Sequence, residues 1–137
     1  MYILDTNVIS DARKVDRASH LANWLRSQSE MDLYISAITI GEISRGAALK
    51  ANKDPSAALP LQDWINQTVS FYADRIIPFD TEDAAVWGKL SATLGHVSID
   101  QMIAAQALNR GAILVTRNVA DFTRTGVEVI NPWDPVG

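Results

Sequence analysis

The first seven residues constrain the fold more than any other part of the chain. Tyr2–Leu4 is short, apolar and β-prone, and it is followed at once by Asp5, Thr6 and Asn7. Open α/β sheets bind their ligands at the carboxyl ends of their strands. A strand that leads directly into a carboxylate and two polar side chains therefore indicates a functional site, which further carboxylates from the rest of the chain could complete.

Size and composition indicate one globular domain over residues 1–137, of which 47% are hydrophobic and 20% charged. Cysteine is absent, which excludes disulfides and thiolate metal sites. We find no apolar run of membrane-spanning length and no secretion signal, so we expect a cytoplasmic protein without membrane association. The net charge of −4 argues against an extended basic surface, but not against an enzyme whose acids gather at a metal.

Short β-like runs alternate with helical ones, which predicts an α/β fold with a central parallel sheet of four or five strands between helices. Strands are expected at residues 2–4, 33–35, 76–79, 112–116 and 127–130, and a turn at 117–122. Helices are expected at residues 7–12, 18–29, 36–53, 60–75, 81–95 and 98–111, with Ser36, Thr81 and Ser98 as caps.

Glu42 is the first acid that could join Asp5. It lies among apolar residues of the predicted helix 36–53, which indicates a half-buried position. Pairing with Arg45 three residues later would explain it equally well as a surface residue. Gly41 and Gly46 lower the helix propensity around it, which indicates a close approach by another backbone or by a ligand.

Two further acids follow the same logic. Asp100 lies in the first turn of a predicted helix, where an acid also complements the helix dipole. Asp121 follows the predicted strand 112–116 together with Thr116 and Asn118, although turn chemistry would account for these polar residues as well. Each acid has an ordinary structural explanation, and only their joint placement predicts a common pocket.

Four neighbouring carboxylates need compensation, because like charges raise one another's pKa. A divalent cation would provide it, and an all-oxygen ligand set favours Mg²⁺ or Mn²⁺ over zinc. Such an ion polarises a phosphoryl oxygen and activates water. His20 and His96 are far apart in the sequence and are expected on the surface, so neither a zinc site nor a histidine base is predicted.

Five motifs follow one another along nearly the whole chain: ILDTNVIS at residues 3–10, ISAITIGEISRG at 35–46, DQMIAAQAL at 100–108, LVTRNVADF at 114–122 and NPW at 131–133. Together they resemble the PIN-domain ribonucleases, and most closely the VapC-type toxins of toxin–antitoxin pairs, including the FitB-like branch. The resemblance implies a PIN-like fold and a metal-dependent endoribonuclease that leaves 5′-phosphate and 3′-hydroxyl ends on RNA.

The family's acidic quartet corresponds to Asp5, Glu42, Asp100 and Asp121. Asp5 and Asp100 would be the central metal ligands. Asp121 would bind a second ion or hold a coordinated water, and Glu42 would support the ion or orient water.

Thr6, Thr116 and Asn7 match the family's supporting polar residues. Many relatives carry an acid where this chain has Asn118, so the fourth-acid role is split between Asn118 and Asp121 and the second ion stays open. Gln101 replaces a residue that is often small in the family, and it would narrow the pocket or hydrogen-bond to substrate.

Five cations are candidate contacts to RNA phosphates, with a solvated basic face as the alternative: Arg13, Lys14, Arg17, Arg117 and Arg124. The family also implies a VapB-type antitoxin lying along an apolar groove, expected between the helices at 18–29 and 36–53. Trp24 and Leu25 are candidate contacts in that groove, although core packing would explain each of them. A homodimer is implied too, with Trp64 or Trp87 in its interface or in the core.

Three alternatives remain to be weighed. A receiver-like phosphoacceptor domain also places an acid and Mg²⁺ at strand ends, but it needs a lysine after a late strand, where this chain has Thr116 and Arg117. An inactive PIN-fold interaction module conflicts with the intact acids, although Asn118 leaves room for it. A structure-specific DNA nuclease shares the chemistry, but the compact chain favours RNA.

Overall fold

A computed structural model of the protein describes residues 1–14, 16 and 19–134. Its strands are β1 (Tyr2–Leu4), β2 (Leu33–Ser36), β3 (Ile76–Ile77), β4 (Ile113–Val115) and β5 (Val129–Ile130). Its α-helices are α1 (Thr6–Ala12), α2 (His20–Ser27), α3 (Ala37–Lys53), α4 (Ala58–Phe71), α5 (Thr81–Leu94), α6 (Ile99–Arg110) and α7 (Val119–Phe122). Short 3-10 turns are η1 (Glu30–Asp32), η2 (Pro55–Ala57) and η3 (Thr123–Thr125).

The five strands form one parallel sheet in the order β3-β2-β1-β4-β5, which confirms the predicted fold class. The chain builds outward from β1 to β3 on one side, then returns to place β4 and β5 on the other. The order therefore reverses between β1 and β4, and open α/β sheets bind ligands at the carboxyl ends of the strands beside such a reversal. Asp5 and Thr116 directly follow these two strands.

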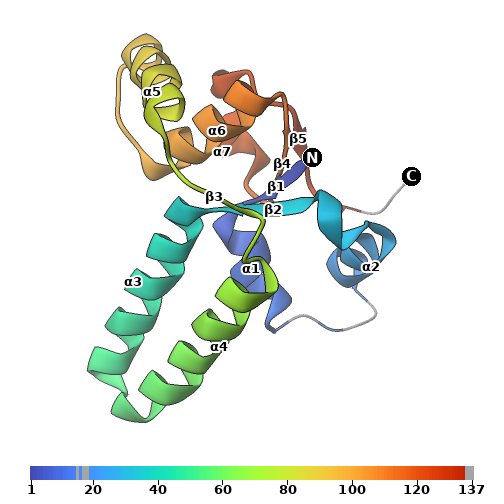
Figure 1. Ribbon diagram of the computed structural model, residues 1–137, viewed down its shortest axis with the longest axis vertical. Helices are drawn as coiled ribbons and strands as arrows, with labels where there is room; N and C mark the ends of the chain where they lie inside the picture. The colour runs from blue at the N-terminus through green and yellow to red at the C-terminus, as the bar shows by residue number, and fades with distance from the viewer. Residues whose placement is uncertain (15, 17–18, 135–137) are drawn as a thin grey trace.

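Helices cover both faces of the sheet (Figure 1): α5, α6 and α7 lie on one side, and α1, α3 and α4 on the other. Alternate residues of β1 face the two layers, because Ile3 packs in a cluster with Ile103 and Phe122, whereas Leu4 packs with Val8 of α1. The helices α3 and α4 run side by side away from the sheet. No helix in the described ranges has the length and apolar character to cross a membrane.

Most element ends agree with their expected caps. Ser36 caps α3 by accepting a hydrogen bond from the Ile38 amide, and Ser98 forms a capping box with Gln101. Gly111 ends α6 with a φ of 61°, a left-handed conformation that favours glycine.

Several predicted bounds are wrong. The helix expected at 60–75 spans 58–71, because an η2 turn leads into it and the chain turns at Tyr72. Asp80, and not Thr81, caps α5 through a reciprocal box with Asp83. The strands expected at 76–79 and 112–116 are shorter, and the turn expected at 117–122 contains the helix α7. Of the helix expected at 18–29, residues 20–27 are helical, and Ala18 lies outside the described residues.

A buried ion pair holds α5 against α6. Asp83 is fully buried, and its carboxylate accepts hydrogen bonds from Arg110, at 2.6 and 3.1 Å, and from Asn109 at 2.9 Å. Burial opposes ionisation of Asp83, but these hydrogen bonds and the Arg110 charge outweigh it and lower its pKa to about 2. The pair therefore holds the end of α6 against the start of α5.

We expect Asp83→Asn to lower the free energy of unfolding by roughly 2–3 kcal/mol at neutral pH, because it removes hydrogen bonds to a charged group. A carboxyl whose pKa is lowered on folding stabilises the fold above its unfolded pKa and loses that contribution as pH falls through the folded value. Wild-type stability should therefore fall between about pH 4 and pH 2, more steeply than that of the variant. Urea unfolding followed by circular dichroism measures both, with the exposed Asp63→Asn as control; equal pH profiles would contradict the assignment.

Candidate active site

Asp5 is the centre of the candidate site. It is only 3% exposed, and it both ends β1 and caps α1, its Oδ1 accepting a hydrogen bond from the Thr6 amide at 2.8 Å. Its Oδ2 accepts hydrogen bonds from the Thr116 hydroxyl at 2.8 Å and from the Asn7 amide at 3.1 Å. Three donors from two adjacent strand ends thus fix the orientation of one buried carboxylate.

Thr116 connects the two strand ends. It is fully buried after β4, and its hydroxyl accepts hydrogen bonds from the Asn7 side chain at 3.1 Å and from the Asn118 backbone amide at 3.0 Å. The Asn7 side-chain oxygen, Oδ1, in turn accepts a hydrogen bond from the Arg117 backbone amide at 3.2 Å. Sequence alone identified these polar residues, and the fold brings them together because β1 and β4 are paired in register.

Glu42 approaches from the other side of Asp5. Its Oε1 accepts a hydrogen bond from the Thr6 hydroxyl at 2.5 Å, and that hydroxyl lies 3.2 Å from the Thr39 hydroxyl. Glu42 is half-buried as expected, and no ion pair with Arg45 forms within the described structure. The alternative that Glu42 is a surface residue paired with Arg45 is therefore wrong.

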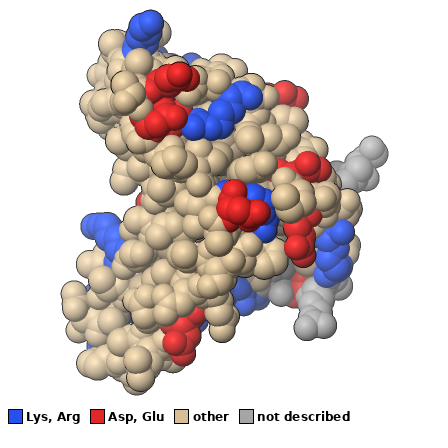
Figure 2. Space-filling model, viewed as in Figure 1, with Lys and Arg blue, Asp and Glu red and all other residues tan. Residues whose placement is uncertain are grey.

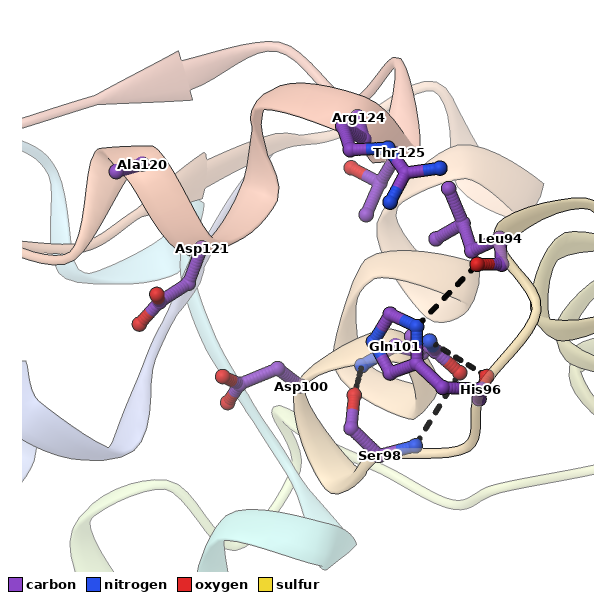
Figure 3. Close-up of a pocket in the computed structure, with 9 residues that line it drawn as sticks. All are labelled: Leu94, His96, Ser98, Asp100, Gln101, Ala120, Asp121, Arg124 and Thr125. Atoms are coloured by element: carbon purple, nitrogen blue, oxygen red, sulfur yellow. Dashed lines mark hydrogen bonds between the residues drawn. The ribbon is translucent and has the colours of Figure 1, made fainter.

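Asp100 and Asp121 supply the remaining carboxylates. Asp100 is half-buried in the first turn of α6, and Asp121 is exposed on α7. Figure 3 shows both carboxylates pointing to the same side of the gap between the two helices, away from Arg124 and His96. Both line an open pocket of about 260 Å³, together with Arg124 and His96.

The electrostatics connect the acids with one another. The pKa of Asp5 is raised, mainly by burial and in part by the Glu42 charge, although the hydrogen bonds from Thr116, Thr6 and Asn7 oppose the rise. The pKa of Asp100 is raised by burial and by the charges of Asp5 and Asp121. Each acid of the predicted quartet thus takes part in a like-charge interaction with another member.

The donor set fits a hard divalent cation in its chemistry. The groups whose charges act on one another are carboxylates, and a cation would offset both the burial and the repulsion that raise the pKa values of Asp5 and Asp100. Within the described residues, no three acids or histidines are close enough to form a ready-made metal cage. Mg²⁺ does not require one, since it keeps several waters and binds through one or two carboxylates plus substrate phosphates.

The candidate phosphate contacts fall into separate places. Arg124 lines the pocket beside Asp100 and Asp121. Arg13 and Lys14 line a groove on the opposite side, beside Thr6 and Glu42.

Arg117 is engaged elsewhere, because it pairs with Asp11 at 2.7 Å and lies over the Trp133 ring. Arg17 lies outside the described residues. Basic and acidic side chains are interspersed on the face in Figure 2, so this face is not a single basic field.

Trp24 and Leu25 are half-buried on α2 and pack against the core around Leu4, where the Trp24 ring meets Tyr2 edge-on at 5.2 Å. The helices predicted to form a groove there do not lie side by side, because α1 separates α2 from α3 in Figure 1. The helix α3 instead borders a groove with α1 and α4. A contact of Trp24 or Leu25 with a partner stays a prediction.

Gln101 lines the pocket of Asp100 and Asp121, as its expected role of narrowing the pocket requires. It is 2% exposed, and its side chain accepts a hydrogen bond from the Ser98 amide and donates one to the His96 carbonyl. It is therefore also a capping residue that shapes the start of α6, and a hydrogen bond from Gln101 to substrate stays a prediction.

Other residues at the site escaped the sequence reasoning. His96 is exposed, as expected, but it also lines the pocket with Asp100. Thr39 of α3 shares the Thr6 hydroxyl with Glu42. Lys50, also on α3, lines the same groove as Glu42. The spacing of Lys50, eight residues after Glu42, is the signal that could have placed it on the same helix face.

Comparison with known proteins gives one consistent result. The PIN domain family matches residues 2–128. The chain is 34% identical to the VapC ribonuclease Y4jK of Sinorhizobium fredii, over 98% of this chain and 99% of that protein. It is also 34% identical to the toxin FitB of Neisseria gonorrhoeae, over 97% and 99%. The crystal structure of FitAcB from the same species superposes with a TM-score of 0.85 at 33% identity, covering 98% of this chain and all of that one.

We expect Asp5→Asn to raise Tm by a few degrees at pH 7 in buffer with a chelator. Asparagine caps a helix as well as aspartate does, and a carboxyl whose pKa is raised on folding opposes folding once pH exceeds its ordinary value. Differential scanning fluorimetry measures the shift, and Glu128→Gln, an exposed acid near β5, serves as control. A lower Tm for Asp5→Asn would show that the site is not strained by its charges.

Proposed function

This chain belongs to the PIN-domain family, in its branch of VapC- and FitB-type toxins, and on that premise we propose that it is a divalent-metal-dependent endoribonuclease. The observation that carries the proposal is the placement of Asp5. It is buried where the strand order reverses, held by hydrogen bonds from Thr6, Asn7 and Thr116, and coupled in charge to Glu42 and Asp100.

Each acid has a distinct role in the proposal. Asp5 and Asp100 hold Mg²⁺ or Mn²⁺, and the burial and like charges that raise their pKa values favour binding of a cation between them. Asp121 faces the same gap from α7 and binds a second ion or a coordinated water. Glu42, positioned by the Thr6 hydroxyl, orients the attacking water. Asn118 has no charge to contribute, so Asp121 takes the fourth-acid role.

When bound, the ion supplies Lewis-acid polarisation of the scissile phosphate and a more acidic water. The protein's own contribution is positional. Thr116, Asn7 and Thr6 keep both Asp5 oxygens in fixed directions, so little reorganisation is needed when the substrate arrives. Arg124 beside Asp100 and Asp121 offsets the charge of the RNA backbone.

The substrate we propose is a single-stranded segment or loop of RNA. Asp100 and Asp121 line one open pocket and Glu42 lines another, and an unpaired strand can enter such pockets more easily than a duplex. Cleavage of cellular RNA also places the protein's action in the cytoplasm.

We expect Asp5→Asn to abolish cleavage of single-stranded RNA in the presence of Mg²⁺ or Mn²⁺, with a loss of at least about 100-fold, while the protein stays folded. Chelation should stop the wild-type reaction and added metal should restore it. Gel analysis of end-labelled RNA measures cleavage, and Asp63→Asn on the exposed side of α4 is the matched control. Equal cleavage by Asp5→Asn and wild type would end the catalytic assignment.

We also propose that a VapB-type antitoxin neutralises the protein, since a relative is named as a toxin and the family pairs toxins with small antitoxins. The expected assembly contains a homodimer. Trp64 and Trp87 are half-buried, and Trp64 packs partly against the core around Leu4.

Expression of the wild-type chain should arrest bacterial growth, and co-expression of a small antitoxin encoded immediately upstream should restore it. Asp5→Asn should not arrest growth, although it should still bind the antitoxin in a pull-down, because Asp5 is buried and the fold is unchanged. Growth arrest by Asp5→Asn equal to that by wild type would mean that toxicity has another origin.

A further inference from the structure

A groove leads away from the acids between α1, α3 and α4. Its near end is formed by Thr6 and Glu42, and its lining continues through Gly46 and Lys50 of α3 to Trp64 of α4. Arg13 and Lys14, at the end of α1, complete it. The groove is therefore continuous with the candidate active site and lies on the side of Asp5 away from the pocket of Asp100 and Asp121.

We propose that this groove is a nucleotide subsite, in which the RNA base next to the cleaved phosphate stacks on Trp64 and the following phosphate meets Lys50, Lys14 and Arg13. The proposal rests on the ribonuclease function proposed above and adds to it a path for the substrate. Three observations support it: the order of charges along the groove, the open space at Gly46, and the position of Arg13 on the Trp64 ring.

The charges change sign along the groove. Glu42, Gly46 and Lys50 are spaced by four residues and form one stripe of α3. Eight residues of helix separate Glu42 from Lys50, roughly 12 Å along the axis. The cations therefore lie farther along the groove than the acids, in the position of the neighbouring nucleotide and not of the cleaved bond. Among the described residues that line the groove, Glu42 is the only acid.

Gly46 leaves space that nothing in the described structure fills. A Cβ at this position would meet no heavy atom within 4 Å outside its own stretch of helix. A glycine inside a helix costs about 1 kcal/mol relative to alanine, and no close approach by the described part of the chain requires it here. The other described glycines also have such space, and Gly46 differs from them by lying on the stripe between Glu42 and Lys50, where a ligand would use it.

Trp64 offers a partly exposed aromatic surface to the groove. The Arg13 guanidinium lies over its ring, 5.3 Å from the centroid, so a base that stacks on this surface displaces a flat, polar group, and Arg13 is then free to meet the phosphate. A nucleobase is such a group, and stacking of bases on aromatic side chains is the usual means of binding unpaired RNA without reading its sequence. A helix from a protein partner would fit the apolar residues Ile43 and Leu61 of the groove, but it would not account for three cations at its far end.

The first experiment measures binding without cleavage. Full-length Asp5→Asn protein is titrated into a fluorescein-labelled oligouridine in chelator, and polarisation gives Kd. We expect Trp64→Leu, which keeps apolar volume but loses the aromatic face, to weaken binding roughly 5- to 100-fold. Trp64→Phe should recover most of this loss. Lys50→Gln should lower the slope of log Kd against log salt by about 0.7, the value for one contact to a single strand.

The second experiment separates the open space from helix stability. Gly46→Ala and Gly88→Ala both replace a helical glycine whose added Cβ would meet nothing nearby, and both should raise Tm by a few degrees. Only Gly46→Ala should also weaken oligouridine binding and raise the KM of cleavage. Equal binding by the two alanine variants would overturn the proposal.

The two proposals can fail separately. If wild-type protein does not cleave RNA but binding still depends on Trp64 and Gly46, the ribonuclease function is wrong and the subsite stands. If wild-type protein cleaves RNA while Trp64→Leu and Gly46→Ala bind and cleave as well as their parents, the subsite is wrong and the function stands. Variants that keep RNA binding but lose inhibition by the antitoxin would assign the groove to the protein partner and overturn the proposal.

Discussion

The buried Asp5 carboxylate is the interaction on which the candidate site depends. Its two oxygens are held by Thr6, Asn7 and Thr116, and these donors come from the ends of two paired strands. A charge in such a position opposes folding, as the raised pKa of Asp5 shows. A fold that retains it must gain its stability elsewhere, and the two apolar clusters on either side of the sheet and the Asp83–Arg110 pair provide it.

The strand order explains why the carboxylates meet at this point. With β1 in the middle of the sheet, a residue at its carboxyl end is surrounded by neighbours from both halves of the chain. The first half supplies Glu42 from α3, and the second half supplies Asp100 from α6 and Asp121 from α7. The capping box of Ser98 and Gln101 forms the turn of α6 that carries Asp100, so residues outside the acidic set contribute to the geometry of the acids.

The pocket and the groove on the two sides of Asp5 differ in the charges that line them. On one side, Asp100, Asp121 and Arg124 border a pocket where acids predominate. On the other, the groove along α3 begins at Glu42 and ends among cations and a tryptophan. A metal ion suits the first environment and a polyanion the second. Under the proposed function, such a polarity would give a single-stranded substrate one preferred direction across the acids.

The sequence by itself determined the α/β class, the parallel sheet, most helix ends and the acidic residues, because these depend on local hydrophobic period, caps and short motifs. It did not determine whether Glu42 is a half-buried acid or a surface residue paired with Arg45. Arg45 is near Glu42 in the sequence, whereas Thr6, which donates a hydrogen bond to Glu42, is near it only in space. It also misjudged the groove beside Trp24, because α2 packs on the core around Leu4 and α1 lies between α2 and α3. Tertiary structure alone decided which side chains converge, because convergence depends on strand order and helix packing between residues far apart in the chain.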